Sequence, residues 1–212
     1  MTRPSPVALP RPRLRAGKSL PECLKRRATI REISGVKLPL QLLSNLLWAA
    51  CGVNRRKGPF GGVGITAASA SNSQEIDVYV ALERGVYRFD ARLHRLQPVV
   101  AGDLRAMAIG PGQKVAMTGP VQLIYVVDVH RLSHTSGFQE PGLQDPEVQK
   151  SYYYVDTGLI AGNVYLFAAS QGLAAWFHNC DRAALAKKLE LRPEQSVLFA
   201  QTVGYPSAHR RE

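Results

Sequence analysis

The residues most able to do chemistry form a short basic run around one hydroxyl group. Arg26, Arg27 and Arg31 surround Thr29 within six residues. A guanidinium group presents a planar fork of N–H donors that fits the oxygens of a phosphate, and a threonine hydroxyl can donate one further hydrogen bond. The run therefore indicates an anion site. The end of any basic helix would look similar, so the run alone does not identify a ligand.

Two other patterns are weaker than their spacing suggests. The segment 62–67 (GVGITA) matches the GxGxxG/A turn of dinucleotide-binding folds, but a basic loop precedes it where that fold needs a strand. His130 and His134 have the i, i+4 spacing of a helical metal pair, yet neither an HExxH motif nor a carboxylate-rich partner accompanies them. We interpret the first as a chance match and the second as surface histidines.

Charge and cysteine usage limit the class of protein. The formal net charge is +11, and residues 1–31 alone hold nine Lys or Arg against one Glu. Because the excess lies in an arm and one local cluster, nucleic-acid binding is disfavoured. Cys23, Cys51 and Cys180 are widely spaced and odd in number, which predicts free, buried thiols in a reducing compartment. No run approaches the roughly 18 apolar residues of a membrane span, so we expect a cytoplasmic protein.

The elements that must position the basic run can be read from local patterns. Ser19-Leu20-Pro21-Glu22 resembles a capping box with proline in the first turn. Helices are expected at 19–27, 39–52, 155–172 and after Asp181, and strands at 76–82, 85–89, 121–129 and 196–203, with a polar surface excursion at 130–150. Regular βαβ alternation is missing, which predicts an α+β fold. Residues 1–17 are expected to be an extended, basic, proline-rich arm, and residues 18–212 a single domain.

Read in order along the chain, these segments resemble the FMN-dependent nitroreductase family, in particular its branch of SagB-type peptide dehydrogenases. The segments that carry the resemblance are 27–31 (RATIR, similar to an Arg-Arg-Ser-x-Arg phosphate motif), 34–52, 66–80, 85–90, 102–105, 155–173 and 203–206. The resemblance implies a mainly antiparallel central sheet flanked by helices, and a domain-swapped homodimer with FMN at the subunit interface. The sequence departs from the family pattern at two positions: Ala28 stands in place of a second arginine, and Ala68 stands in place of proline.

The resemblance also implies roles for particular residues around the FMN phosphate and ring. Arg27 and Thr29 would hold the phosphate or ribityl chain, with Arg210 or Arg211 completing the anion site, and Arg26 could compensate for Ala28. Arg31 would lie near the flavin N1 and C2 carbonyl, where a fixed positive charge stabilises the anionic reduced flavin.

Further residues are assigned by the same resemblance. Gln113 would bond the pyrimidine edge, Ser69, Ala70 and Asn72 would reach FMN from the partner subunit, and the turn 176–179, with Asn179, would lie near the flavin N5. Simpler interpretations stay open: Asn72 and Gln113 as ordinary loop residues, Thr29 as a helix end, and the tail arginines as solvated.

The implied activity is hydride transfer from NADH or NADPH, through the flavin, to a small electron-poor acceptor such as a nitroaromatic or quinone, by ping-pong turnover. The flavin carries the chemistry, so no catalytic side chain is expected. Three alternatives remain: an FMN-dependent dehydrogenase of azolines in modified peptides, a non-catalytic flavin-binding protein, and a basic nucleic-acid binder, which would need salt-dependent DNA binding that survives deletion of residues 1–17.

Overall fold

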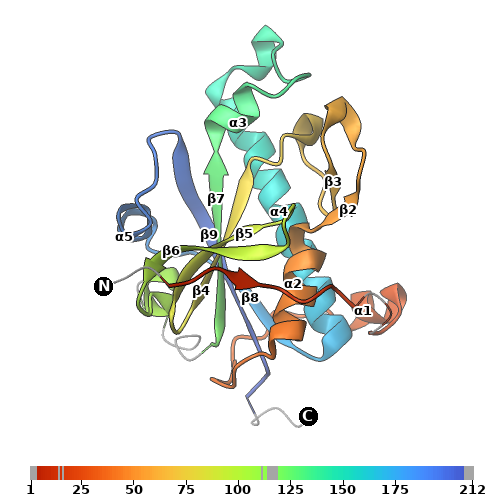
Figure 1. The fold of residues 1–212 in the computed structure, drawn as a ribbon, viewed down its shortest axis with the longest axis vertical. Coiled ribbons are helices and arrows are strands. Elements are labelled where there is room, and N and C mark those ends of the chain that lie inside the picture. The colour runs from red at the N-terminus through yellow and green to blue at the C-terminus, as the bar shows by residue number, and fades with distance from the viewer. Residues whose placement is uncertain (1–3, 14, 16, 111, 114–118, 208–212) are drawn as a thin grey trace.

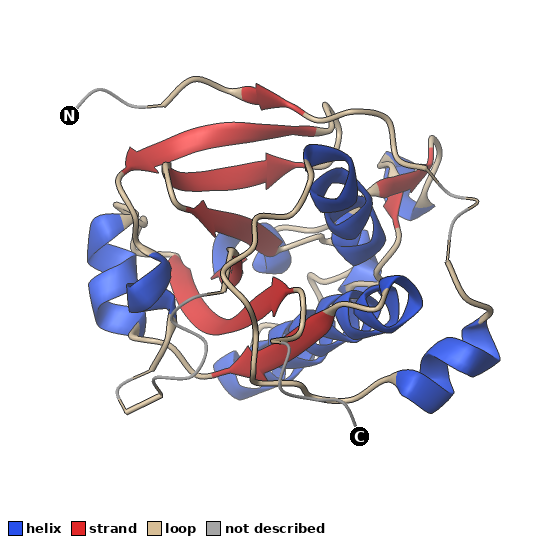
Figure 2. Cartoon of the chain, turned by 90° about the horizontal axis from the view of Figure 1, so that it is seen from below, coloured by secondary structure: helices blue, strands red, loops and turns tan. Residues whose placement is uncertain are grey.

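The computed structural model describes residues 4–13, 15, 17–110, 112–113 and 119–207 of this chain of 212 residues. Its centre is a seven-stranded sheet in the order β1-β6-β5-β4-β7-β9-β8, in which neighbouring strands pair antiparallel. Helices α2 and α4 cover one face and α5 covers the other (Figures 1 and 2). The predicted α+β fold with a mainly antiparallel sheet is confirmed.

The bounds of the elements follow the chain order shown in Figure 1. The helices are α1 (Leu20–Arg26), α2 (Leu40–Cys51), α3 (Val129–Ser133), α4 (Pro146–Gln171) and α5 (Arg182–Lys188). The strands of the main sheet are β1 (Val7–Ala8), β4 (Ile76–Leu82), β5 (Gly85–Asp90), β6 (Arg95–Ala101), β7 (Val121–Asp128), β8 (Ala174–His178) and β9 (Gln195–Gly204). Strands β2 (Val53–Arg55) and β3 (Gly64–Ile65) form a separate hairpin.

Strand β7 is the middle of the sheet, as its continuous apolar run predicted. All eight of its residues are buried, and it pairs with β4 on one edge and β9 on the other. A strand covered by helices on both faces needs apolar side chains in every position, which explains the missing alternation. The hairpin predicted for 76–82 and 85–89 is also present. Leu82 pairs with Gly85 next to the turn, and Tyr79 pairs with Arg88 at the other end of the ladder.

The long helix α4 begins nine residues earlier than the predicted 155–172. The Asp145 side chain accepts hydrogen bonds from the backbone N–H groups of Glu147 and Val148, and Pro146 occupies the first helical position. The predicted surface excursion at 130–150 is therefore wrong in its last part. The first turns of α4 are polar, so apolar periodicity does not reveal them, although the Asp-Pro-Glu start signal is present in the sequence.

Two local predictions need correction. The Ser19 hydroxyl makes no capping hydrogen bond, and Glu22 pairs with Arg26 one turn later instead of closing a capping box. The supposed turn at 176–179 is the end of strand β8, because the backbone of Ala174–His178 pairs with β9. Pairing to a neighbouring strand is a long-range property that local turn signals cannot report.

The N-terminal arm lies along its own domain. Val7 pairs with Leu96 of β6, and Leu9 is buried in the main core. The carbonyl oxygen of Pro10 accepts a hydrogen bond from Ser44 on α2. The described part of the arm is thus anchored to the sheet edge and to α2.

The prediction of free, buried thiols is confirmed for Cys23, Cys51 and Cys180. Burial raises the pKa of the Cys51 thiol to about 12, which leaves it protonated and unreactive. His130 and His134 stack on the exposed side of α3, as the surface interpretation predicted. Within the described ranges, none of the helices combines the length and the apolar character that crossing a bilayer requires.

Candidate functional site

The basic run follows α1 as an extended segment beside strand β8. The backbone N–H of Ile30 donates to the carbonyl oxygen of Ala175 at 3.0 Å, and Ile33 forms a β-bridge with Pro206. Side chains two residues apart face the same way in an extended chain. This geometry presents Arg27, Thr29 and Arg31 together.

Tyr165 of α4 organises this segment. Its hydroxyl oxygen accepts a hydrogen bond from the backbone N–H of Phe177 at 2.8 Å and lies 3.1 Å from Oγ1 of Thr29. Because the Tyr165 oxygen already accepts, its own proton can be donated to Thr29. The Thr29 hydroxyl then keeps its proton available for a ligand. The Arg27 guanidinium lies over the same tyrosine ring, with its carbon 5.7 Å from the ring centroid.

The charges of this segment are not neutralised by the part of the chain that is described. Arg27 and Arg31 are exposed, and no acidic side chain in the described ranges pairs with either of them. The Arg31 guanidinium carbon lies 5.8 Å from the ring centroid of Trp176. Arg26 differs, because its Nε donates to Glu22 at 2.8 Å. Arg27, Thr29 and Arg31 can therefore offer two guanidinium forks and one hydroxyl to an anion.

Gln113 and Asn179 meet around Gly110, next to this segment. The carbonyl oxygen of Asn179 accepts from the Gly110 N–H at 3.2 Å, and the Gln113 N–H donates to the Gly110 carbonyl at 3.1 Å. A Cβ at Gly110 would come within 3.3 Å of the Asn179 oxygen and 3.4 Å of Gln113 Oε1. Oε1 of Gln113 is buried and has no hydrogen-bond donor among the described residues. An unsatisfied buried acceptor of this kind is costly unless a ligand supplies a donor.

Residues 69–74 form a loop whose polar groups hydrogen-bond to other groups of the same chain. The Ser69 hydroxyl accepts from the Gln74 N–H at 3.0 Å, and the Ala70 N–H donates to Asp156 of α4 at 2.9 Å. The Asn72 amide donates to the carbonyl oxygens of Pro59 and Val63 and accepts from Gln74. The geometry thus shows a structural use for Asn72, in line with the simpler interpretation of this residue.

The arginine segment and the 69–74 loop contact different parts of α4. Thr29 contacts Tyr165, and Ala70 contacts Asp156. These two helix residues are nine positions apart, which corresponds to about 13 Å along the axis. The structure therefore does not bring the two sets of predicted site residues together within one chain.

Around and before the Asp156 contact, α4 carries an exposed apolar stripe. Tyr152, Val155 and Leu159 follow an i, i+3, i+7 spacing and are 37%, 60% and 44% exposed. A Cβ at Gly158 would meet nothing within 4 Å. Apolar groups in this spacing normally face a partner surface.

Some residues near the site were not predicted from the sequence, and one predicted residue is outside the described part of the chain. Tyr165 was not expected, since an aromatic residue inside an apolar helix looks like an ordinary core residue. Trp176 was expected in a turn, whereas it lies on β8 and packs against Ile109 and Ile33. Arg210 falls outside the described residues, and the last described segment, 205–207, runs beside 32–34.

Comparison with known proteins identifies the family of this chain. The sequence profile of the Nitroreductase family matches residues 24–205, which include both the arginine segment and the 69–74 loop. This chain belongs to the nitroreductase family. The predicted family and the predicted nitroreductase-like fold are both confirmed.

Individual relatives agree with this membership. A solved structure from Ralstonia eutropha JMP134, described as a candidate nitroreductase, is 34% identical, covers 96% of this chain and 90% of its own, and gives a TM-score of 0.82. A candidate nitroreductase of Methanocaldococcus jannaschii is 28% identical, over 73% of this chain and 75% of its own. The NADPH:FMN oxidoreductase of Vibrio harveyi, solved with NAD+, shares the fold at 19% identity and a TM-score of 0.61, over 89% of this chain and 69% of its own.

In this nitroreductase-family chain, the two departures from the expected motif are exposed. Ala28 lies between Arg27 and Thr29 and faces solvent, and Ala68 faces solvent just before the 69–74 loop. Neither substitution leaves a buried gap. Arg26, the residue expected to compensate for Ala28, is already paired with Glu22.

Proposed function

We propose that this nitroreductase-family chain binds FMN as a homodimer and transfers hydride from NADH or NADPH to a small electron-poor acceptor, such as a nitroaromatic or quinone. The observation that carries the proposal is the arginine segment, with two guanidinium groups that have no acidic partner in the described chain and one hydroxyl fixed by Tyr165. The NADPH:FMN oxidoreductase activity of the Vibrio harveyi protein of the same fold supports the choice of flavin and nicotinamide.

The residues present suit the two polar ends of FMN. Arg27 and Thr29 would bind the phosphate, because charge-assisted hydrogen bonds and a hydroxyl donor match its oxygens. Gln113 has an Oε1 with no donor among the described residues, and this oxygen would accept a hydrogen bond from the pyrimidine edge of the ring. Arg31, over the Trp176 ring, would place a fixed cation near that edge.

FMN would supply the chemistry by accepting and passing on two electrons as hydride. The chain would bind the flavin, orient its ring and hold positive charge beside it. Asn179 would contribute to the ring edge through its backbone, because its carbonyl oxygen is fixed by Gly110 and by the His178 ring. No side chain is needed to move a proton at the reacting atoms.

The homodimer is supported by two features of α4. The arginine segment and the 69–74 loop contact α4 about 13 Å apart along its axis, which supports a site completed by the loop of a second chain. The exposed stripe of Tyr152, Val155 and Leu159 on the same helix would offer the apolar surface for that contact. Ser69 and Ala70 of one chain would then face the flavin held by Arg27 and Arg31 of the other.

An absorbance experiment tests this function. The protein, purified without added flavin and then reconstituted with FMN, should show flavin absorbance that bleaches anaerobically with NADH or NADPH and returns when a quinone or nitroaromatic is added. Bands that persist with both nicotinamides would favour azoline oxidation or flavin storage instead. A protein that cannot be reconstituted with FMN would overturn the proposal.

A further inference from the structure

Two buried carboxyl groups meet beneath the 69–74 loop. Glu75 lies directly before β4 and is 0% exposed, and Asp156 lies on α4 and is 5% exposed. Both side chains bind the same short loop, Glu75 through the Ser73 hydroxyl and Asp156 through the Ala70 N–H. Two carboxylates cannot both keep their charge cheaply in such a place, because each loses hydration and repels the other.

The hydrogen bonds around the pair show where a proton must lie. Oε2 of Glu75 accepts from the Ser73 hydroxyl at 2.6 Å, and Oδ2 of Asp156 accepts from the Ala70 N–H at 2.9 Å. Oε1 of Glu75 has no donor among the described residues. A proton on Oε1 turns that unsatisfied acceptor into a donor toward Asp156. One proton thus completes a chain from Ser73 through Glu75 and Asp156 to Ala70.

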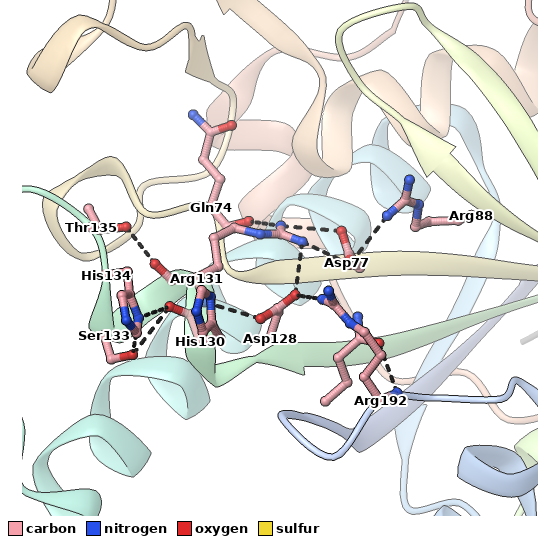
Figure 3. A network of polar contacts seen from close by, with 11 residues as sticks. Gln74, Asp77, Arg88, Asp128, His130, Arg131, Ser133, His134, Thr135 and Arg192 are labelled. Atoms are coloured by element: carbon pink, nitrogen blue, oxygen red, sulfur yellow. Dashed lines mark hydrogen bonds and ion pairs between the residues drawn. The ribbon is translucent and has the colours of Figure 1, made fainter.

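The charged groups around the pair do not replace that proton. Arg131 of α3 is the nearby cation, and it donates to the carbonyl oxygen of Gln74 at 2.6 Å. Its two terminal nitrogens are bound by Asp77 at 3.3 and 3.0 Å, as Figure 3 shows, and Asp128 lies 3.6 Å from one of them. Arg131 therefore pairs with Asp77 and Asp128, which also contact Arg88 and Arg192, and within the described chain it forms no ion pair with Glu75 or Asp156. The loop 69–74 itself carries no charged side chain.

We propose that Glu75 and Asp156 hold one proton between them and act as positioning residues for the 69–74 loop. The proposal rests on the flavin-binding role proposed for this loop. While the proton is present, the pair binds both Ser73 and Ala70 and fixes the loop against α4. When the pair loses that proton to solvent, two adjacent carboxylates remain. Their repulsion loosens the loop and lowers the affinity for the flavin.

The direction of the pH dependence follows from burial. Burial raises the pKa of Glu75 from 4.5 to about 7, and burial also raises the pKa of Asp156. Between pH 4.5 and about 7 the folded chain therefore holds a proton that the unfolded chain has lost. The contribution of the pair to stability is complete below this window, falls as pH rises through it, and is level above it.

The test compares Glu75→Gln with the wild-type chain. A glutamine is always neutral, accepts from Ser73 and donates to Asp156, so it imitates the protonated pair. Glu194→Gln is the matched control, because Glu194 is exposed and its side chain is not used in the site. Three quantities are measured from pH 4.5 to 9: FMN retained after repeated ultrafiltration, the unfolding temperature of flavin-free protein, and the infrared carbonyl band of a protonated carboxyl group.

Wild-type protein and Glu194→Gln should lose FMN retention and unfolding temperature as pH rises through the window, and should lose one protonated-carboxyl band. Glu75→Gln should hold both quantities nearly constant and lack the band. If Glu75→Gln keeps the wild-type pH dependence, or if wild-type protein at pH 6 shows no protonated carboxyl, the proposal is wrong. Asp156→Asn gives the same test if Glu75→Gln does not fold.

The infrared and unfolding measurements do not require flavin. A chain that shows the band and the pH-dependent unfolding but never binds FMN would refute the proposed function while leaving the shared proton established. A chain that binds FMN with no such band would refute only the carboxyl pair.

Discussion

The arginine segment 27–31 and the 69–74 loop contact the same helix but use their polar groups in opposite ways. In the arginine segment, Arg27 and Arg31 have no acidic partner in the described chain. In the loop, side chains and N–H groups are bound to one another, to the hairpin, or to Asp156. The arginine segment can therefore donate hydrogen bonds to a ligand, whereas the 69–74 loop is held in place by its own hydrogen bonds. The two should therefore respond differently to substitution.

The largest effect is expected from Arg27→Gln combined with Arg31→Gln. Each lost charge-assisted hydrogen bond costs about 1.5–3 kcal/mol, so FMN affinity should fall by about 100-fold or more. The unfolding temperature of the flavin-free protein should change little, because neither side chain has an acidic partner in the described chain. FMN titration by fluorescence measures the affinity. Arg26→Gln, whose guanidinium is paired with Glu22, is the control, and a similar loss there would contradict a specific site.

Asn72→Ala should show the opposite pattern. Asn72 makes three side-chain hydrogen bonds and has a φ of 56°, which alanine tolerates poorly. We expect a loss of about 2 kcal/mol in the free energy of unfolding of flavin-free protein, measured in urea. Ser71→Ala is the matched control, since Ser71 also has a positive φ but makes one exposed side-chain bond. Equal losses in both variants would show that Asn72 does not fix the loop.

Tyr165→Phe tests the support beneath the arginines. The phenylalanine loses the contact with Thr29 and leaves the Phe177 N–H without its acceptor. FMN affinity should fall by about tenfold, which corresponds to about 1.4 kcal/mol. Tyr152→Phe, on the exposed stripe of α4, removes a hydroxyl away from the arginines and should leave FMN affinity nearly unchanged.

The smallest effect is expected from Gln113→Met. This substitution should affect the stability of the flavin-free protein and the affinity for FMN in opposite directions. Removing a buried acceptor that has no donor among the described residues should keep or slightly raise the stability of flavin-free protein. The affinity for FMN should still fall, by about 1 kcal/mol, because the pyrimidine edge loses its acceptor. Calorimetric unfolding with and without FMN measures both. A loss of stability without flavin would mean that Oε1 is satisfied within the chain.

Sequence alone predicted the elements whose signals are local. Strand β7 has a continuous apolar run, α2 has clear helical periodicity, and Asp181 accepts from Ala184 at the start of α5 as expected. The arginine segment was found because its residue types and order resemble a family motif. These features need only neighbouring residues to be recognised.

The features that sequence could not predict depend on distant residues. Tyr165 and Thr29 are 136 positions apart, and Glu75 and Asp156 are 81 apart, so no local pattern marks either contact. Strand β6 contains Pro98 and reads poorly as a strand, yet it pairs with β5 on one edge and β1 on the other. The polar start of α4 was missed because a helix that projects from the core has little apolar periodicity to show.

The central claim is that one flavin site needs the arginine segment of one chain and the 69–74 loop of another, and mixed dimers test it most directly. One parent carries Arg27→Gln and Arg31→Gln; the other carries Ala70→Pro, which removes the N–H that binds Asp156. Each parent should bind FMN poorly. Dimers that contain one chain of each kind should regain one tight flavin site, formed by the two unaltered regions, so FMN should bind at one per two chains. If the mixed dimers bind no more FMN than their parents, the two regions do not form a shared site and the account is wrong.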